Sequence, residues 1–281
     1  MNLLKLFLGV IVISAFAALA TSQFAGCTKT KTDVIHDTTT ITKVDTLTKV
    51  DTVHVNDSIY DLRDGLVAYY NFKGSNLNDS SGYGNNITFN NATPTADRFG
   101  NANGAYLFNG TTTYMQVPNS TSLNPSNFSL MAIFKPNGFY AGDCHGNQLF
   151  GKGYPDNING YYFLRFTDFV SSCSSPVDTS NELFNGGITG AGVAADTPLV
   201  RTGQWYNLIV TYDGITAKVY LNGALKKSTN ITTPSFTPNN HDFFIGKHED
   251  PAFPYYFNGV IDEVRVYNKA LPFGAIKQLS N

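Results

Sequence analysis

The sequence predicts an all-β fold, a sandwich or a barrel of antiparallel strands. Three observations predict it. Short apolar or alternating segments recur along most of the chain, turn dipeptides separate them, and helical periodicity is confined to the last ten residues. Many short strands at regular spacing are typical of these two architectures.

Nine segments have strand character, and five of the dipeptides between them favour hairpin turns that need a positive φ. In residues 205–212, alternation places Tyr206, Leu208, Val210 and Tyr212 on one face, which we expect to be core. The segments are Leu66–Phe72, Tyr106–Asn109, Tyr114–Val117, Phe128–Lys135, Tyr161–Thr167, Trp205–Tyr212, Ala217–Asn222, Phe243–Lys247 and Val260–Tyr267. The dipeptides are Asn109-Gly110, Asn137-Gly138, Asp213-Gly214, Asn222-Gly223 and Asn258-Gly259.

Residues 1–26 have the pattern of a secretory signal peptide: Lys5, an apolar run from Leu6 to Ala20, and Phe24-Ala25-Gly26 before Cys27. This ending resembles the lipobox of bacterial lipoproteins, although Phe24 stands where Leu is usual. The resemblance implies a lipid on Cys27, a membrane anchor through it, and a place in the bacterial cell envelope, periplasmic or surface-exposed. An uncleaved membrane span is the alternative. The apolar run of about 15 residues is short for such a span, which needs about 20.

Residues 27–61 form a polar segment rich in Thr, Val and Asp. A six-residue unit at Lys43–Thr48 recurs at Lys49–His54 and, blurred, at Val55–Tyr60. Alternating β-branched residues favour extended backbone, so we expect an extended tether. Pairing of the repeats as strands, or a stalk in an oligomer, is the alternative. Residues 62–281 are then expected to form one domain.

The chain has three cysteines, an odd number for an exported protein. Lipidation of Cys27 leaves Cys144 and Cys173 to pair in a disulfide, which persists outside the cytosol. The alternative is a metal site at Asp143, Cys144 and His145. It lacks a second nearby Cys or His at ligand spacing.

The charge balance argues against nucleic acid as a partner. The net charge is −2, only 14% of the residues are charged, and the sequence has no basic patch. Aromatic residues make up 14% of the chain, which suits both sheet packing and stacking on sugars.

Four stretches carry a family resemblance. In chain order they are Asn78–Asn86, Ala105–Gly110, Gly203–Gly214 leading into Lys218–Gly223, and Phe257–Leu271. They look like the laminin-G-like, concanavalin A-like lectin jelly-roll family of bacterial surface proteins, over about Gly65 to Leu279. The resemblance implies a jelly-roll sandwich of two antiparallel sheets with six or seven strands each.

Some members of that family are glycosidases that carry several carboxylates on one strand. Here only Asp262 and Glu263 adjoin in a strand, and neighbouring strand residues are expected to point to opposite faces. Glu182 and Glu249 are isolated. We therefore expect no catalytic residues.

The resemblance also implies a structural Ca²⁺ on the rim of the sandwich, between an N-terminal turn and the last strand. Asp79 and Asp262 are the positions that would serve. The alternative is that Asp79 caps its own turn and that Asp262 makes an internal hydrogen bond. The sequence leaves both open.

Aromatic-rich loops provide the glycan-binding candidates Tyr140, Tyr154, Tyr255 and Tyr256, with Arg165 and Asp168 expected along the same face. Flat rings stack on sugars while polar neighbours bond hydroxyls. The alternative is that the rings seal the rim of the core. The expected function is a carbohydrate-binding, lectin-like envelope module. A protein-binding or structural envelope module, with an extracellular protein as partner, is the other.

Overall fold

The structure is a computed structural model. It describes residues 38–44, 50–56, 59–153, 160–168, 176–179, 182–188, 191–195, 199–231 and 236–281. The chain divides into two compact units, Met1–Ser58 and Ile59–Asn281. The second unit begins a few residues before the boundary expected at residue 62. Tyr60 belongs to it, because its N–H donates to Gln278 Oε1 at 2.8 Å.

In the first unit, β1 (Thr38–Val44) and β2 (Val50–Asn56) pair antiparallel. The expectation of a single extended tether is therefore wrong here, because two strands of this segment pair. β2 lies largely within the second repeat, whereas β1 lies mostly before the first repeat and shares only Lys43 and Val44 with it. Both strands are rich in β-branched residues, which favour extended backbone. The register sets Lys43 opposite Asp51.

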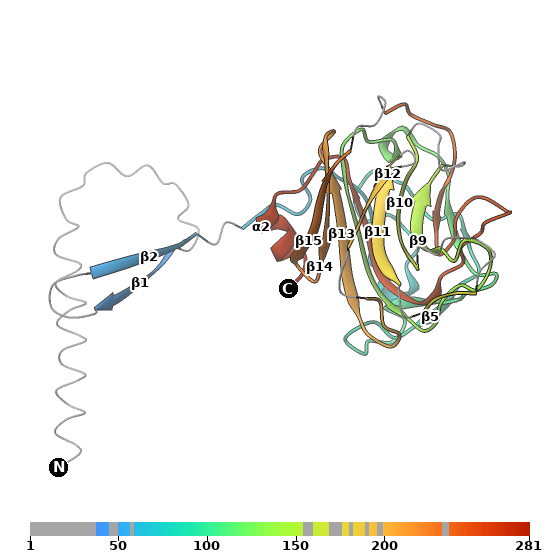
Figure 1. Cartoon of the computed structure of the whole chain (residues 1–281), viewed down its shortest axis with the longest axis horizontal. Helices are drawn as coiled ribbons and strands as arrows, with labels where there is room; N and C mark the ends of the chain where they lie inside the picture. Colours follow the sequence, from blue (N-terminus) through green and yellow to red (C-terminus); the bar gives the residue numbers. More distant parts are fainter. Residues whose placement is uncertain are drawn as a thin grey trace, which may run out of the picture. The chain divides into compact units, whose positions relative to one another are not determined.

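The second unit is a sandwich of two antiparallel sheets (Figure 1). The seven-stranded sheet has the order β12-β11-β10-β9-β16-β7-β4. Its strands are β4 (Phe89–Asn90), β7 (Met115–Val117), β9 (Asn147–Lys152), β10 (Tyr162–Thr167), β11 (Leu183–Ile188), β12 (Ala191–Ala194) and β16 (Phe243–Ile245).

The eight-stranded sheet has the order β15-β14-β13-β8-β17-β6-β5, with β3 also paired to β17. Its strands are β3 (Leu66–Tyr70), β5 (Thr93–Thr95), β6 (Ala105–Asn109), β8 (Phe128–Pro136), β13 (Tyr206–Tyr212), β14 (Thr216–Leu221), β15 (Ala224–Asn230) and β17 (Asn258–Tyr267). Two 3₁₀ turns, η1 (Lys73–Ser75) and η2 (Thr121–Leu123), and the helix α2 (Phe273–Gln278) complete the unit.

The all-β jelly-roll sandwich predicted from the sequence is confirmed, and each of the nine predicted segments contains a strand. One predicted turn is wrong, because Asn258 and Gly259 lie inside β17. Asn222 does form a turn, between β14 and β15, with φ of 50° followed by 75° at Gly223. Both angles suit the Asn-Gly hairpin turn.

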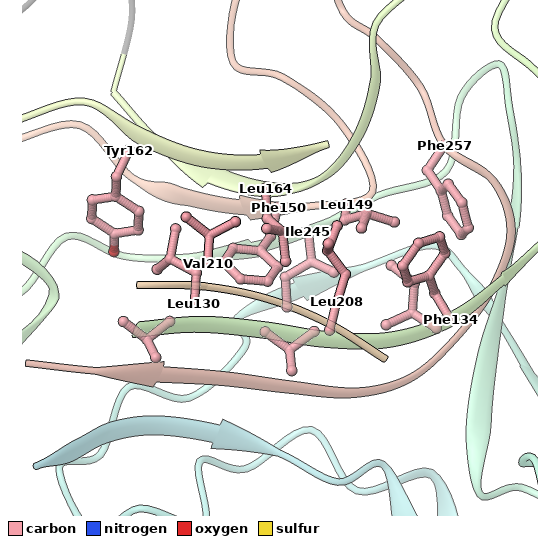
Figure 2. Close-up of a cluster of buried hydrophobic side chains, with 14 of the residues drawn as sticks. Leu130, Phe134, Leu149, Phe150, Tyr162, Leu164, Leu208, Val210, Ile245 and Phe257 are labelled. Atoms are coloured by element: carbon pink, nitrogen blue, oxygen red, sulfur yellow. The ribbon is translucent and has the colours of Figure 1, made fainter. Parts of the chain in front are cut away.

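The interior of the sandwich is one aromatic-rich core. Figure 2 shows side chains of the eight-stranded sheet, such as Leu130, Phe134 and Leu208, facing those of the seven-stranded sheet, such as Phe150 and Leu164. The four residues of β13 that alternation assigned to the core are all in it: Tyr206, Leu208, Val210 and Tyr212.

A second apolar cluster lies on the outer face of the eight-stranded sheet. Ile209 and Tyr220 of the sheet pack there with Leu271 and with Ile276 of α2. This cluster explains the apolar residues on the non-core face of β13.

The helices of the described ranges are all too short or too polar to span a membrane.

Candidate functional site

Three of the predicted tyrosines form one cluster at the seven-stranded sheet. The rings of Tyr140 and Tyr255 meet edge to face, with centroids 6.2 Å apart and planes at 82°. Burial raises the pKa of Tyr140, and the charge of Asp143 and the nearby Tyr256 raise it further. The fourth candidate, Tyr154, lies outside the described residues.

Tyr255 is more deeply placed than expected for a loop residue that stacks on a ligand. Its side chain is only 7% exposed, whereas Tyr140 and Tyr256 are half-buried. Its ring lies over Gly146, where an added Cβ would come within 2.7 Å of the ring. The Tyr255 carbonyl accepts a hydrogen bond from Gln148 N at 2.9 Å. Tyr255 therefore matches the alternative of a ring that seals the core rim.

Beside Tyr255, a row of three polar residues crosses the outer face of the sheet. Arg165 of β10 stands opposite Gln148 of β9 on one side and opposite Asn185 of β11 on the other. Its neighbours in β10, Leu164 and Phe166, belong to the core, so alternation turns Arg165 outward. We call Gln148, Arg165 and Asn185 the polar row.

Aromatic rings hold the centre of the polar row. The Arg165 guanidinium carbon lies 4.2 Å from the Phe163 ring centroid and 5.5 Å from that of Tyr255. Cations within about 6 Å of a ring face are attracted by its quadrupole. The predicted proximity of Arg165 to the tyrosines is thus what the structure shows.

The two amides of the polar row have polar atoms without partners. Gln148 is fully buried and Asn185 is 4% exposed. Within the described part of the chain, Gln148 Oε1 and both Asn185 side-chain polar atoms have no hydrogen-bond partner. Gln148 Nε2 donates to the Phe150 carbonyl at 3.0 Å, so the oxygen is the unused end of that amide. Buried polar groups are nearly always paired, so three such atoms in one row need an explanation.

Asp168, expected on the same face, lies elsewhere. It is buried with His145, and His145 Nδ1 is 2.9 Å from Asp168 Oδ2. Burial raises the pKa of Glu182 to about 8, and the charge of Asp168 adds to the rise. Asn147 connects this acidic group to the tyrosines, because its Oδ1 accepts a hydrogen bond from Tyr140 N at 2.8 Å. We call His145, Asn147, Asp168 and Glu182 the buried acidic cluster.

The contacts of Asp79 favour the turn-capping alternative over a calcium ligand. Its Oδ1 accepts hydrogen bonds from Tyr69 N at 2.9 Å and Ser81 N at 2.8 Å. Its Oδ2 accepts from Ser81 Oγ at 2.7 Å and Asn85 N at 3.0 Å. A Ca²⁺ ion would have to displace these donors, because it binds the same oxygen lone pairs.

Asp262 is paired with an arginine. Arg98 Nη1 lies 2.7 Å from Asp262 Oδ2 and 3.8 Å from Glu263 Oε2. The two aspartates thus have separate protein partners. Among the described residues, no group of three or more His, Cys, Asp or Glu side chains is arranged to hold a metal ion.

The expectation that Asp262 and Glu263 point to opposite faces is wrong. The register of β17 against β8 shifts between Ile261 and Glu263, so a bulge interrupts the alternation. Both carboxylates therefore approach Arg98. Glu263 Oε1 also lies 2.5 Å from Arg265 Nε, so both acids are compensated by arginines.

The cysteine predictions extend beyond the described residues. Cys27 lies outside them, as does Cys173. Cys144 is described and is disulfide-bonded. Its pairing with Cys173 stays a prediction.

Sequence reasoning missed Gln148, Asn185 and Asn147, and it did not bring His145, Asp168 and Glu182 together. β9 and β11 were not among the predicted strands because glycines and amides interrupt their apolar runs. Without those strands, nothing placed an amide on each side of Arg165. Both strands have a leucine-phenylalanine pair and an amide close before a glycine, Gly151 or Gly186, and this shared pattern is the signal that points to them.

Comparison with known proteins agrees with this architecture. A family model described as the concanavalin A-like lectin/glucanases superfamily matches residues 109–277, more than half of the chain. No curated protein matches the sequence.

Among solved structures, domain 4 of AbnA, an extracellular GH43 arabinanase from Geobacillus stearothermophilus in complex with arabinotriose, is 25% identical. Its TM-score is 0.53, with 77% of this chain and 98% of that chain covered. The binding domain of Paraclostridial Mosquitocidal Protein 1 is 16% identical, with a TM-score of 0.54 and coverage of 79% and 53%.

The botulinum neurotoxin serotype D binding domain is 14% identical, with a TM-score of 0.53 and coverage of 78% and 51%. The chain spans about half the length of each of these two toxin structures, and at this identity they show the fold alone. Together with the two-sheet sandwich, the family match shows that the chain belongs to the concanavalin A-like lectin/glucanases superfamily.

Proposed function

We propose that the domain binds glycans without catalysis, on the outer face of the seven-stranded sheet at the polar row. The unpartnered amide atoms of Gln148 and Asn185 carry this proposal. A buried amide that lacks a partner costs about 1–3 kcal/mol. A sugar ring supplies hydroxyls that both donate and accept, so it would satisfy an amide oxygen and an amide N–H in one place once the side chains that cover these buried atoms move aside.

The aromatic surroundings of the row suit the same ligand class. Tyr140 and Tyr256 are half-buried, so each leaves part of a ring accessible beside Tyr255. Phe163 and Tyr255 hold the Arg165 guanidinium between the amides. A few polar groups placed among apolar and aromatic side chains are typical of small-molecule sites.

The side chains at the row argue for binding rather than hydrolysis. A retaining glycosidase needs two carboxyl groups about 5 Å apart across the scissile bond. The polar row offers two amides and a guanidinium instead. Asp262 and Glu263 are engaged by Arg98 and Arg265 in the other sheet, which leaves neither carboxylate poised for acid–base work.

Arabino-oligosaccharides are the first ligands to test, because the arabinanase domain of similar fold was solved with arabinotriose. Calorimetric titration of the domain with arabinotriose and with xylo-, cello- and galacto-oligosaccharides should reveal binding. Gln148→Met and Asn185→Leu should each weaken it about tenfold or more, which corresponds to about 1.4 kcal/mol. Asn230→Leu, at an exposed amide of β15 in the other sheet, is the matched control and should leave affinity unchanged.

If the wild-type domain binds none of these glycans, with or without Ca²⁺, the protein-binding alternative becomes the better account. Equal affinity of the Gln148→Met variant and the wild type would instead show that the site is misplaced.

We also propose that a lipid on Cys27 holds the protein in the bacterial envelope. The apolar run followed by Ala25-Gly26-Cys27 supports this. Cys27→Ser should accumulate unprocessed precursor and abolish labelling with a fatty-acid probe. Labelling that survives the substitution would refute the anchor.

A further inference from the structure

A groove opens on the other side of the sandwich, at the outer face of the eight-stranded sheet. Arg98, Phe99, Ile133, Trp205, Asn207 and Leu279 are among the residues that line it. Ile133 belongs to β8 and Asn207 to β13, whereas Arg98 and Phe99 come from the loop between β5 and β6. The two outer faces of a sandwich point in opposite directions, so this groove is separate from the polar row.

Trp205 provides a flat wall of the groove. It precedes β13 and packs only partly against the apolar cluster that contains Ile133 and Ile209. Lys135 Nζ lies 5.2 Å from its ring centroid. The half-buried indole therefore has apolar area available beside a cationic donor.

Phe99 stands exposed on a braced loop. Its side chain is 73% exposed, the highest value among the large apolar residues described. The loop is held by Asp97, whose Oδ1 accepts hydrogen bonds from Phe99 N and Asn101 N, both at 2.8 Å. Asn101 Nδ2 adds a third bond, to Asp97 Oδ2, at 2.9 Å. A large ring presented to water on such a fixed turn favours contact with a ligand over packing.

The polar lining of the groove is also fixed in position. Asp262 Oδ2 accepts hydrogen bonds from Arg98 Nη1 at 2.7 Å and from Arg98 N at 3.2 Å. The Arg98 guanidinium carbon lies 4.5 Å from the Phe99 ring centroid. Asn207 Nδ2 donates to the Leu279 carbonyl at 2.7 Å, and Asn207 Oδ1 is buried without a partner among the described residues.

We propose that this groove is a second saccharide-binding site, which takes one sugar ring between Trp205 and Phe99. Two rings supply apolar contact for the faces of a sugar, while the Arg98 guanidinium supplies donors for its hydroxyls. The inference shares only its ligand class with the proposed function and does not depend on the polar row.

Trp205 is the only tryptophan of the chain, so tryptophan emission, as distinct from tyrosine emission, comes from this groove. The domain is titrated with arabinotriose and the other oligosaccharides, and tryptophan emission is followed together with calorimetric heat. We expect a saturable change of emission. Phe99→Ala should weaken the affinity measured from this emission change about tenfold, because it removes one of the two rings that contact the sugar. The ring is exposed, so its loss should leave the fold intact. Tyr83→Ala, at a ring that is 57% exposed outside the groove, is the matched control and should respond like the wild type.

Gln148→Met separates the two sites. An emission change that persists in Gln148→Met and is weakened in Phe99→Ala supports the groove, whether or not the polar row binds. Calorimetric binding with unchanged emission, or an emission change insensitive to Phe99→Ala, overturns the groove and leaves the proposed function standing. Absence of both signals across the panel overturns both sites.

Discussion

The rings of Tyr140 and Tyr255 meet edge to face, 6.2 Å between centroids, and this contact joins a half-buried residue to a buried one. Tyr255 also lies 5.3 Å from the His248 ring and has a φ of 44°. A non-glycine residue with positive φ is held there by its surroundings. Tyr255 thus supports the site from below, while Tyr140 and Tyr256 present its surface.

Tyr255→Ala should therefore destabilise the domain by about 3–5 kcal/mol, the range for an aromatic residue removed from a core. Tyr256→Ala should cost much less, because Tyr256 is half-buried. Urea unfolding of the two variants measures the difference. Equal, small losses in both would show that Tyr255 is not part of the core rim.

Gln148→Met should change the free energy of unfolding only a little, even as glycan binding falls. The substitution removes an amide oxygen, Oε1, that has no partner among the described residues, which is favourable. It also removes the hydrogen bond from Nε2 to the Phe150 carbonyl, which is unfavourable, so the two effects offset each other. Chemical denaturation with and without saturating oligosaccharide tests this, and a loss of several kcal/mol in the ligand-free protein would contradict it.

The strands of the core were predictable from the sequence because their burial imprints a clear pattern. In β13, alternation identified four core residues correctly, since one face of that strand meets the opposite sheet. β15 (Ala224–Asn230) escaped prediction for the opposite reason. It is an edge strand, mostly exposed, and its polar sequence carries no such pattern.

The candidate site was predictable only in part. Aromatic enrichment pointed to Tyr140, Tyr255 and Tyr256, which the structure brings together with Arg165. The burial of Tyr255 depends on Gly146, a contact that loop composition does not encode. Reading a strand from sequence assumes that its side chains alternate strictly between two faces. The bulge at Asp262 breaks this alternation, so the sequence could not show that Asp262 and Glu263 lie on the same side.

Removal of divalent cations should not change the stability of the domain. Asp79 accepts four hydrogen bonds from protein donors, and Asp262 is paired with Arg98. The thermal midpoint in EDTA should therefore equal that in millimolar Ca²⁺. A midpoint several degrees higher in Ca²⁺ would show that the structural calcium implied by the family resemblance is present after all.

A disulfide between Cys144 and Cys173 should be recovered by non-reducing peptide mapping of protein purified from the envelope. It would close a loop of about 30 residues, which the chain-entropy model values at about 3–4 kcal/mol. Reduction should therefore lower the free energy of unfolding, and Cys173→Ser should do so to the same extent. Two alkylatable thiols in the unreduced protein would refute the pairing.

Glu182 should make the domain less stable as the pH rises. Burial, followed by the charge of Asp168, raises its pKa to about 8 from the ordinary 4.5. Between these values the folded carboxyl keeps its proton, whereas the unfolded carboxyl has lost it. The folded state then binds more protons, so stability is greatest below about pH 4.5 for this group and falls until the folded pKa is passed.

Glu182→Gln removes that titration while it keeps the neutral shape of the side chain. His145, Asp168 and Asp178 remain in place in both proteins, so Glu182 is the only one of these groups that differs between them. Unfolding of wild type and variant is compared at about pH 5 and about pH 8.5. The variant should gain stability relative to the wild type at the higher pH. There the unfolded wild type has an ionised Glu182, so folding must either return a proton to this carboxyl or bury its charge. The variant has neither cost. A constant difference between the two proteins at both pH values would show that Glu182 ionises normally in the folded state.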